Sequence, residues 1–278
     1  MKIGVIVQTR LTSTRLPEKV LLPLPANSKT TALDQVIKRL KACNNIDEII
    51  IATTINKCDE KVVEAAELNG VKWFRGDEHD VLSRFYYAAI ENQLEVVVRV
   101  TSDCPLIDPA IIDDTIAIFN EGDWDYIFNF NSYPHGFAVE VFTFKALEKT
   151  FNEATKKIDR EAVALYMEEH PDKFKVKEIF APEKYQNHRL RVTLDTKDDY
   201  ILLCQVYDYL YREDQIIKIE EILSLFEKKP WLYEINSSVR QKSAFNSLKE
   251  EVVEAIKILE LQDLDRAAEY FKSKLSEV

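Results

Sequence analysis

Short β-branched apolar runs alternate with helical patterns through the first two thirds of the chain, and no other feature restricts the fold as much. The runs predict strands at residues 2–8, 48–54, 71–76, 95–103 and 125–131. Between them, apolar residues three and four positions apart predict helices at 32–43, 59–70, 80–93 and 109–122. Strands that alternate with helices form βαβ units. The sequence therefore predicts an α/β fold with three layers and a mostly parallel sheet.

The pattern changes after Ala138. Alternating polar and apolar residues at 138–144, 173–181 and 189–196 suit antiparallel or edge strands with one solvated face. Helices are expected near 145–154 and 160–170, and the chain is predicted to be helical after Asp195, at 198–213, 218–229 and 247–275. Helix-boundary residues agree with several of these assignments: Gly70 and Gly122 stand at expected ends, and Asp59 and Asp108 at expected starts.

Charge and cysteine content exclude several classes of function. The chain of 278 residues has 37 basic and 48 acidic residues, which argues against a broad surface for nucleic acid or anionic membrane. Its four cysteines are too far apart for a zinc cage or a disulfide framework, so free thiols are expected. No apolar run approaches the roughly 20 residues that span a bilayer. We expect a soluble cytoplasmic protein.

A basic segment, QTRLTSTRLPEK, follows the first predicted strand directly. In open α/β sheets this loop commonly binds phosphate. Glycine-rich phosphate loops use backbone amides, but this loop has no glycine, so its cations Arg10, Arg15 and Lys19 would have to bind the anion. Pro17 keeps the segment from forming a helix. Spacing alone does not exclude the alternative, a solvated loop whose arginines form weak surface ion pairs.

Two aspartates follow predicted strands, Asp103 after VVVRVTS and Asp195 after RLRVTL. An aspartate at such a position often caps the next helix, but Asp108 and Asp198 are better placed for capping. Asp103 and Asp195 are therefore available for other roles. Two carboxylates that converge suit Mg²⁺, which takes one or two protein oxygens together with water and substrate phosphate.

These segments together resemble a known family. QTRLTSTRLPEKVLLPL, DVLSRFYYAA, VVRVTSDCPLIDP, YPHGFAVEVFTFKAL, DREAVALYM and RLRVTLDTKDDY are similar, in this order, to the spore-coat polysaccharide cytidylyltransferases. More broadly they resemble enzymes that activate acidic sugars, such as 3-deoxy-manno-octulosonate and acylneuraminate, as CMP derivatives. The similarity extends from about Lys2 to Tyr211. Thr12 and Glu18 stand where the family usually has glycine, and Ala162 stands where its DREH motif has histidine.

The resemblance implies a Rossmann-like nucleotidyltransferase sheet that binds CTP at the strand ends. The catalytic domain would span 1–212, with an acceptor-side and dimerisation excursion at about 130–190, and 213–278 would form a helical C-terminal extension. Arg10, Arg15 and Lys19 would line the triphosphate, and Asp103 and Asp195 would hold Mg²⁺. Further nucleotide contacts are expected from Gln8, Thr9, Ser13, Arg75, Asp80, Thr101 and Ser102.

For the acceptor, the implied residues are Tyr133, His135, Glu140, Arg160 and Glu161. The sequence also leaves structural roles open for these residues. His135 contacts the substrate from its loop or is a structural or surface group, as a lone histidine more often is, and Glu140 faces either a pocket or solvent. Arg160 binds either an acceptor anion or a neighbouring carboxylate, Glu161 or Asp159. Asp80, for its part, suits a helix start as well as a nucleotide contact.

The predicted function is transfer of CMP from CTP to a small anionic acceptor, such as an acidic sugar, with release of pyrophosphate by a homodimeric enzyme. One alternative keeps CTP but uses a phosphorylated or phosphonylated small molecule as the acceptor. A second is a non-catalytic nucleotide-binding module. A glycosyltransferase is disfavoured because no DxD run follows a suitable strand.

Overall fold

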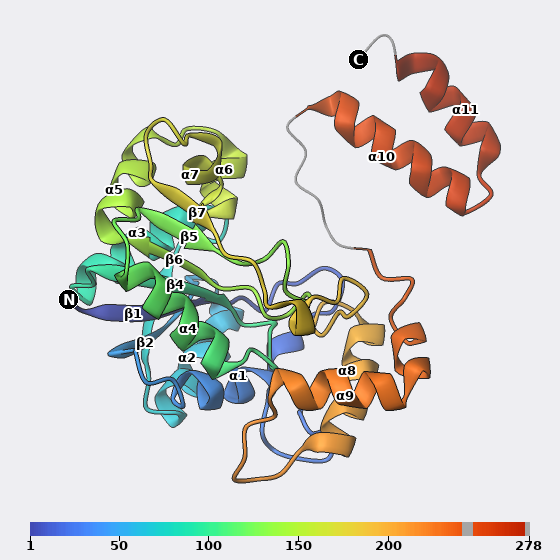
Figure 1. Ribbon diagram of the computed structural model, residues 1–278. Helices are drawn as coiled ribbons and strands as arrows, with labels where there is room; N and C mark the ends of the chain where they lie inside the picture. The colour runs from blue at the N-terminus through green and yellow to red at the C-terminus, as the bar shows by residue number, and fades with distance from the viewer. Residues whose placement is uncertain (241–246, 276–278) are drawn as a thin grey trace. The chain divides into compact units, whose positions relative to one another are not determined.

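The computed structural model of the protein describes residues 1–240 and 247–275. The chain divides into two compact units, Met1–Val239 and Arg240–Val278 (Figure 1). The first contains a seven-stranded sheet with helices on both faces. The second contains helices α10 and α11 in its described residues.

The sheet has the strand order β3-β2-β1-β4-β6-β5-β7. β1 to β4 are mutually parallel wherever they pair, β6 runs antiparallel to β4 and β5, and β7 pairs with β5 in parallel at one edge. The predicted mostly parallel sheet is therefore confirmed. The strands are β1 Ile3–Gln8, β2 Glu48–Thr54, β3 Lys72–Gly76, β4 Val96–Thr101, β5 Tyr126–Phe128, β6 Glu140–Thr143 and β7 Val176–Glu178.

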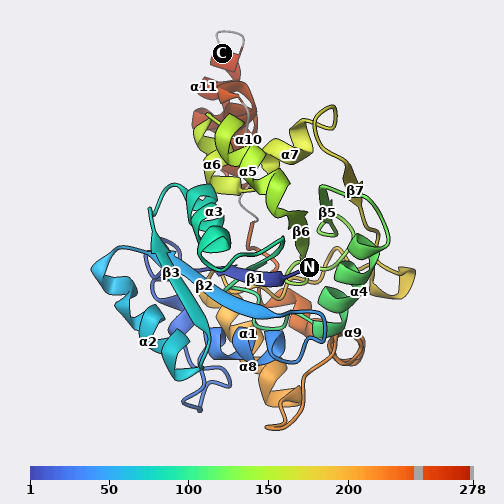
Figure 2. The same ribbon diagram turned by 90° about the vertical axis from the view of Figure 1, so that its left-hand side faces the viewer.

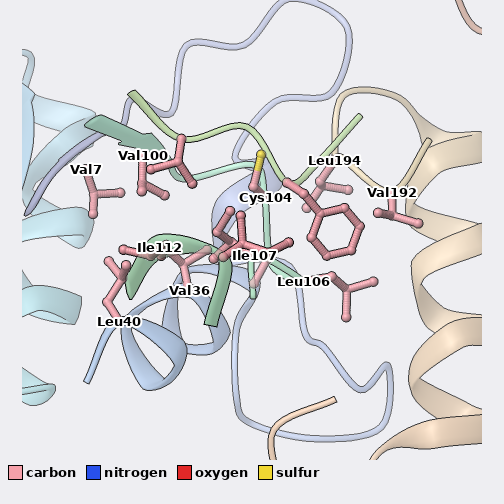
Figure 3. Packing of buried hydrophobic residues seen from close by; sticks show 14 of the residues in the cluster. Val7, Val36, Leu40, Val100, Cys104, Leu106, Ile107, Ile112, Val192 and Leu194 are labelled. Atoms are coloured by element: carbon pink, nitrogen blue, oxygen red, sulfur yellow. The ribbon is translucent and has the colours of Figure 1, made fainter. Parts of the chain in front are cut away.

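Helices cover both faces of this sheet, which confirms the three-layer fold. Neighbouring residues of a strand point to opposite faces. Thus Val5 and Val7 of β1 join one core with α1, α2, α4, α8 and α9, while Ile6 joins a second with α3, α5 and α7 (Figures 2 and 3). The helices are α1 Ala32–Leu40, α2 Glu60–Leu68, α3 Val81–Glu91, α4 Pro109–Asn120, α5 Phe144–Glu153, α6 Lys157–Ala162, α7 Leu165–Glu169, α8 Lys197–Leu210 and α9 Ile219–Lys228.

Two local predictions after residue 150 are wrong. The segment 189–196 forms no strand; a single isolated bridge joins Arg191 to His135. Its alternating apolar residues are buried in the core without a continuous hydrogen-bonded ladder. The single helix expected at 160–170 is two short helices, α6 and α7, because Val163 between them has a left-handed backbone with φ of 60°.

The expected helix caps are partly confirmed. The Asp108 side chain accepts from Ala110 N at the start of α4. At the start of α8, however, the cap is Thr196 in a capping box with Asp199, and the prediction of Asp198 is wrong. A capping box needs an acid three residues after the cap, and Asp199 meets that spacing from Thr196.

The first unit includes α9 and the short helix Pro230–Glu234, and Phe226 and Leu232 are buried in its core. The assignment of 1–212 as a catalytic domain and 213–278 as an extension stays a prediction. The second unit contains α10 Leu248–Leu261 and α11 Asp265–Lys274, which pack around a small apolar cluster. None of the described helices combines the length and the apolar character needed to cross a membrane.

Candidate active site

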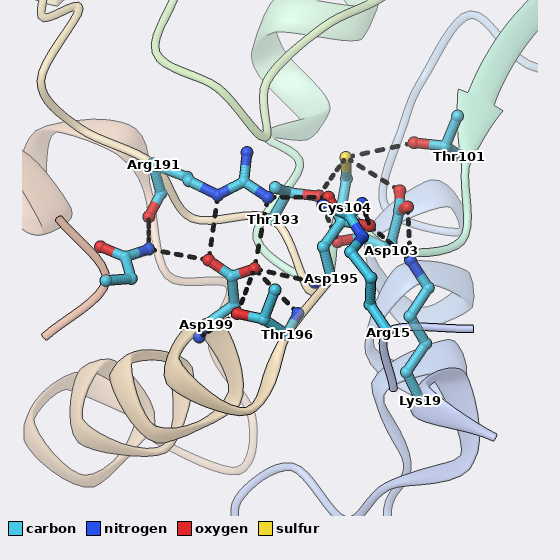
Figure 4. A network of polar contacts seen from close by, with 11 residues as sticks. Arg15, Lys19, Thr101, Asp103, Cys104, Arg191, Thr193, Asp195, Thr196 and Asp199 are labelled. Atoms are coloured by element: carbon cyan, nitrogen blue, oxygen red, sulfur yellow. Dashed lines mark hydrogen bonds and ion pairs between the residues drawn. The ribbon is translucent and has the colours of Figure 1, made fainter. Parts of the chain in front are cut away.

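The centre of the candidate site is one ammonium group between two carboxylates. Lys19 Nζ lies 2.8 Å from Asp103 Oδ2 and 2.8 Å from Asp195 Oδ1 (Figure 4). The three residues come from the loop after β1, the end of β4 and the segment before α8. The structure therefore brings together the two aspartates and the loop lysine that the sequence singled out.

The sheet register explains this convergence. β1 and β4 pair in parallel with Gln8 opposite Thr101, so both chains leave the sheet at the same edge. The turn after β4 is also tied to the segment before α8, because the main-chain oxygen of Asp103 accepts from Leu194 N at 2.7 Å and from the Thr193 hydroxyl at 3.1 Å. Asp195 is thereby held opposite Asp103.

Two arginines complete the charge balance around Asp195. Arg15 Nη2 lies 2.8 Å from Oδ1, and Arg191 Nη2 lies 2.7 Å from Oδ2. Arg191 also contacts Asp199, whose carboxylate accepts the main-chain N–H of Asp195 at 3.1 Å (Figure 4). Three cations thus face three carboxylates in a mostly buried cluster.

Charge complementarity sets the ionisation of this cluster. Burial by itself would raise the pKa of Asp195, but Lys19, Arg15 and Arg191 hold that pKa at about 2. Burial by itself would lower the pKa of Lys19, but Asp103 and Asp195 raise it above its ordinary value. Asp195 and Lys19 are therefore both charged at neutral pH, as metal and phosphate binding require of a carboxylate and an ammonium group.

The glycine-free loop is held in shape from outside. The buried Asp59 carboxylate accepts Leu11 N at 2.9 Å, and Leu11 O in turn accepts Glu18 N at 3.1 Å. Glu18 has a left-handed backbone with φ of 53°, which is the geometry that glycine usually provides. These contacts close the base of the loop just before Lys19. Asp59, predicted as a helix start, precedes α2 but makes no side-chain cap.

The remaining nucleotide-side residues lie around the same sheet edge. Arg10 is half exposed and is 3.6 Å from Glu78 Oε1. Gln8 Oε1 accepts from Arg99 Nε at 3.0 Å, and Ser102 N donates to Gln8 O at 3.2 Å. Thr9 and Ser102 are buried, and Ser13 and Thr101 are partly exposed. Nucleotide contact by Gln8, Thr9, Ser13, Thr101 and Ser102 stays a prediction.

Arg75 and Asp80 are engaged within the protein. Arg75 donates to the carbonyls of Thr54 and Asn56, each at 2.9 Å, and pairs with Glu60 at 2.6 Å. Asp80 caps α3 by accepting from Ser83 N. Their direct nucleotide contacts also stay predictions, whereas the capping role of Asp80 is confirmed.

The Asp80 carboxylate also binds Arg160, a predicted acceptor residue. Arg160 Nε and Nη2 lie 3.0 and 2.5 Å from its two oxygens. Arg160 does pair with a carboxylate, but its partner is Asp80 and not the expected Glu161 or Asp159. Glu161 is exposed and lies 3.7 Å from Lys157.

His135 lies beside the central cluster. Its main chain pairs with Leu190 and Val192, on either side of Arg191. Burial and the charge of Arg191 lower the pKa of His135, so the ring is neutral at pH 7. Tyr133 nearby is half-buried, and burial raises the pKa of its phenol to about 12. Both remain candidates for acceptor contact.

Glu140 faces neither a simple pocket nor solvent. It is buried, forms an ion pair with Arg99, and accepts from the Tyr126 hydroxyl at 2.9 Å. The same hydroxyl lies 3.1 Å from Glu168 Oε1. A polar network therefore extends from Gln8 at the nucleotide side to Glu168 on α7.

Sequence reasoning missed several members of these networks: Asp59, Arg99, Tyr126, Glu168, Arg191 and Asp199. Arg191 could have been predicted, because it precedes Asp195 by four residues in the same short segment, RLRVTLDT. Arg99 could also have been predicted, as a charged residue within an otherwise apolar strand. Tyr126 and Glu168 could not be identified, since only the tertiary fold places them beside Glu140.

The donor set at the centre fits a hard divalent cation. Among the described residues, no cluster of three or more histidine, cysteine or acidic side chains could hold a metal by itself. Asp103 and Asp195 nevertheless each have one carboxylate oxygen 2.8 Å from the same point, which Lys19 Nζ occupies. Two carboxylates with remaining positions for water and phosphate form the coordination that Mg²⁺ prefers.

Comparison with known proteins identifies the family of the chain. The cytidylyltransferase family model matches residues 4–239. An uncharacterised protein of Methanocaldococcus jannaschii is 40% identical over 244 residues, which is 87% of this chain and 98% of that protein. The spore coat polysaccharide biosynthesis protein SpsF of Bacillus subtilis is 32% identical over 232 residues, covering 81% of this chain and 94% of that protein.

Structural comparison gives the same result. The structure of a cytidylyltransferase from Leptospira borgpetersenii superposes with a TM-score of 0.77 and 31% sequence identity, covering 88% of this chain and all of that one. The residues matched by the family model, 4–239, include the sheet strands from Gly4 onward, the helices of the first unit and the segments that carry the charged cluster. The chain therefore belongs to the cytidylyltransferase family and is a nucleotidyltransferase.

Proposed function

We propose that the protein transfers CMP from CTP to a small anionic acceptor, such as an acidic sugar, and releases pyrophosphate. The observation that carries this proposal is the placement of Lys19 Nζ at 2.8 Å from both Asp103 and Asp195. This supports the proposal because a cation suited to phosphate and two carboxylates suited to a metal ion lie together at one sheet edge.

In the proposed reaction an acceptor oxygen attacks the α-phosphorus of CTP in line. A bond forms between that oxygen and phosphorus while the bond to the bridging oxygen breaks, and pyrophosphate leaves. Arg10, Arg15 and Lys19 supply positive charge opposite the pyrophosphate group. Because little covalent chemistry falls to the protein, rate acceleration comes mainly from positioning and neutralisation.

Asp103 and Asp195 are the proposed holders of Mg²⁺. When bound, this ion would neutralise phosphate charge and polarise the phosphoryl oxygens. The low pKa of Asp195 keeps its carboxylate ionised, and therefore able to bind a cation, throughout the neutral range. Arg191 and Asp199 hold Asp195 in place from the opposite side.

The acceptor is proposed to bind between His135 and the polar network of Glu140. Acidic sugars carry both a carboxylate and hydroxyl groups, and this region offers the guanidinium of Arg191 with buried acidic and phenolic groups. SpsF, by its name, acts in polysaccharide biosynthesis, which supports a sugar over other anions. A homodimer stays part of the proposal.

An acceptor screen tests this function. The protein is incubated with CTP, Mg²⁺ and either keto-acid sugars or phosphorylated and phosphonylated small molecules, and both pyrophosphate and the CMP product are measured. Keto-acid sugars should yield a phosphodiester of CMP. A diphosphate-linked product would identify the second acceptor class, and tight CTP binding without pyrophosphate release across all acceptors would refute catalysis. Light scattering on the same preparation determines whether the enzyme is a dimer.

A further inference from the structure

Arg84 is a buried cation whose role the proposed reaction has not used. It lies on α3 and is 2% exposed. Its Nη1 contacts two main-chain oxygens, Thr9 O at 3.4 Å and Ala52 O at 3.3 Å, and its buried Nε has no hydrogen-bond partner. Within residues 1–240 and 247–275, no carboxylate lies within ion-pair distance of Arg84. The guanidinium is thus poorly satisfied.

Arg84 nevertheless remains charged. Burial and, second, the positive charge of Arg10 lower the pKa of Arg84 to about 10, which still leaves it protonated at neutral pH. Burying a charge without a close partner costs several kcal/mol in typical proteins. A hydrophobic side chain of similar length would avoid that cost, so stability alone does not explain an arginine here.

The acidic residues that act on Arg84 from a distance have other partners. Asp59 accepts Leu11 N and Thr54 N. Asp77 accepts the main-chain N–H groups of His79 and Asp80. Because these carboxylates are occupied and out of contact, none of them closes an ion pair with the guanidinium.

Glu78, the third such carboxylate, faces the loop. It accepts from Asn56 Nδ2 at 2.7 Å and from the Thr12 hydroxyl, and it lies 3.6 Å from Arg10. Among the residues that the structure describes, this long contact is the one ion pair of Arg10. Two guanidinium groups, Arg10 and Arg84, remain weakly paired near the beginning of the loop.

The neighbouring strand makes room for the arginine. A Cβ atom on Gly76 would lie 2.7 Å from Arg84 Cγ, closer than side chains pack. Gly76 has no positive φ, so its backbone does not require glycine. The absence of a side chain at the end of β3 instead allows the aliphatic part of Arg84 to pass toward the ends of β1 and β2.

That position is directly beneath the phosphate loop. Thr9 is the first residue after β1, and its carbonyl is one of the two that Arg84 contacts. The hydroxyl of Thr9 is also buried without a hydrogen-bond partner. An under-satisfied cation therefore contacts the main chain of a residue whose own hydroxyl is under-satisfied, and an anion bound at the loop would supply the missing counter-charge.

We propose that Arg84 is a polyphosphate-binding residue, for which the β- and γ-phosphates of the bound nucleoside triphosphate are the counter-charge. This inference rests on the proposed function and extends its phosphate site to the far side of the loop. The cluster around Lys19 is already balanced, with three cations against three carboxylates, whereas Arg84 adds positive charge that has no partner in contact. Its contribution should therefore grow with the number of phosphates.

Calorimetric binding tests this proposal. CTP, inorganic pyrophosphate and CMP are titrated, with Mg²⁺, into the wild-type protein and into Arg84→Met and Arg84→Lys. We expect Arg84→Met to weaken CTP and pyrophosphate binding tenfold or more and CMP binding less than threefold. Arg84→Lys should retain most of the affinity because it keeps the charge. The melting temperature of Arg84→Met should equal or exceed that of the wild type, because an unpaired buried charge is removed.

Arg39 provides a matched control. It is equally buried at 2% exposure, and its Nη1 also contacts two main-chain oxygens, those of Ile107 and Ile217, in the core on the other face of the sheet. Arg39→Met should leave the ratio of CTP to CMP affinity unchanged, whatever it does to stability. This variant separates loss of a buried arginine in general from loss of the one beneath the loop.

The outcomes distinguish this inference from the proposed function. Equal loss of CTP and CMP affinity in Arg84→Met with a lower melting temperature, or unchanged affinity for CTP, would overturn the role of Arg84. A wild-type protein that binds CTP but forms product with no acceptor would instead refute the proposed transfer, while the arginine comparison would stand. A wild-type protein that binds neither CTP nor pyrophosphate would overturn both.

Discussion

Lys19 Nζ and Asp195 Oδ1 lie 2.8 Å apart although 176 positions separate the two residues in the sequence. The contact joins the loop after β1 to the segment before α8, across the edge of a sheet whose β1 and β4 are hydrogen-bonded neighbours. It places opposite charges at the point where, in the proposed reaction, a nucleotide and a metal would meet.

Replacing Asp103 by asparagine should abolish CMP transfer without unfolding the protein. The variant removes one of the two proposed Mg²⁺ ligands but keeps the side-chain shape, and we expect pyrophosphate release to fall at least about 100-fold. Asp198→Asn in the first turn of α8 is a matched control, since Asp198 lies outside the charged cluster. Near wild-type turnover of Asp103→Asn, with a normal circular dichroism spectrum, would contradict the assignment.

The pKa of Asp195 predicts a specific acid sensitivity. Because this carboxyl has a pKa of about 2 in the fold and an ordinary value near 3.8 when unfolded, its contribution is complete above pH 4 and is lost as pH falls toward 2. The shift corresponds to about 2 kcal/mol. Urea unfolding at pH 7 and pH 3 should show a smaller acid loss in Asp195→Asn than in the wild type. Identical losses in the two proteins would show that the charged cluster does not stabilise the fold.

Much of the fold could be predicted from the sequence, because the spacing of apolar residues and the types of residue indicate the same elements. β1, β2 and β4 are short, mostly buried and bounded by helical patterns, and β3 is a short, partly exposed strand at the sheet edge with the same bounds, so each was recognisable by itself. The segment 189–196 has the same alternation but no ladder, since its apolar side chains are buried by α8 and the core instead of by sheet neighbours. Alternating polar and apolar residues indicate that one side of a segment is buried, but they do not indicate whether its backbone pairs with a neighbouring strand.

The candidate site was predictable where a charged residue follows a strand. Asp103 follows β4, and Arg15 and Lys19 lie in the loop after β1. Asp195 follows an apolar segment that was predicted as a strand but forms none, and all four residues still meet in the structure. Partners contributed by helix interiors were not predictable. Glu168 on α7 looks like any surface acid in the sequence, and only the packing of α7 against β5 brings it to Tyr126.

Glu168 should make the protein less stable in mildly alkaline solution. One phenolic proton of Tyr126 cannot satisfy both Glu140 and Glu168, so Glu168 is best accommodated in its protonated form. Burial and the negative charge of Glu140 raise the pKa of Glu168 to about 7, against an ordinary value of 4.5. Because the pKa of Glu168 is higher in the folded protein than in the unfolded chain, the folded protein binds more protons between pH 4.5 and 7. The free energy of unfolding therefore falls as pH rises through this range.

The variant Glu168→Gln tests this sign. It should match the wild type near pH 4.5 and be more stable above pH 8 by about 3 kcal/mol, measured by urea unfolding. Glu161→Gln, an exposed acid on the neighbouring helix, should show no such divergence. A Glu168→Gln protein that is equally or less stable than the wild type at pH 8 would show that the carboxyl is charged without penalty.

Asp59 should prove essential for the shape of the glycine-free loop after β1. Asp59→Ala leaves two buried N–H groups, those of Leu11 and Thr54, without their acceptor, and we expect a loss of about 2–4 kcal/mol in unfolding free energy. The KM for CTP should rise as well. Asp113→Ala is the control, because that carboxylate also accepts two main-chain N–H groups, but at an exposed site. Equal effects of the two substitutions would show that the buried tether is not special.

The pair of Asp80 and Arg160 decides between a structural and a ligand-binding role for the arginine. Both its Nε and Nη2 contact Asp80, its Nη1 donates to Phe151 O at 2.9 Å, and the guanidinium stacks 4.6 Å from the Phe151 ring. With these donors engaged, we expect Arg160→Met to destabilise the fold by about 1–2 kcal/mol and to leave the KM for the acceptor within threefold of the wild type. A double-mutant cycle with Asp80→Asn should give a coupling energy of about 0.5–1.5 kcal/mol, since both side chains are partly exposed. A tenfold or greater rise in acceptor KM, with negligible coupling to Asp80, would instead return Arg160 to direct recognition of an acceptor anion.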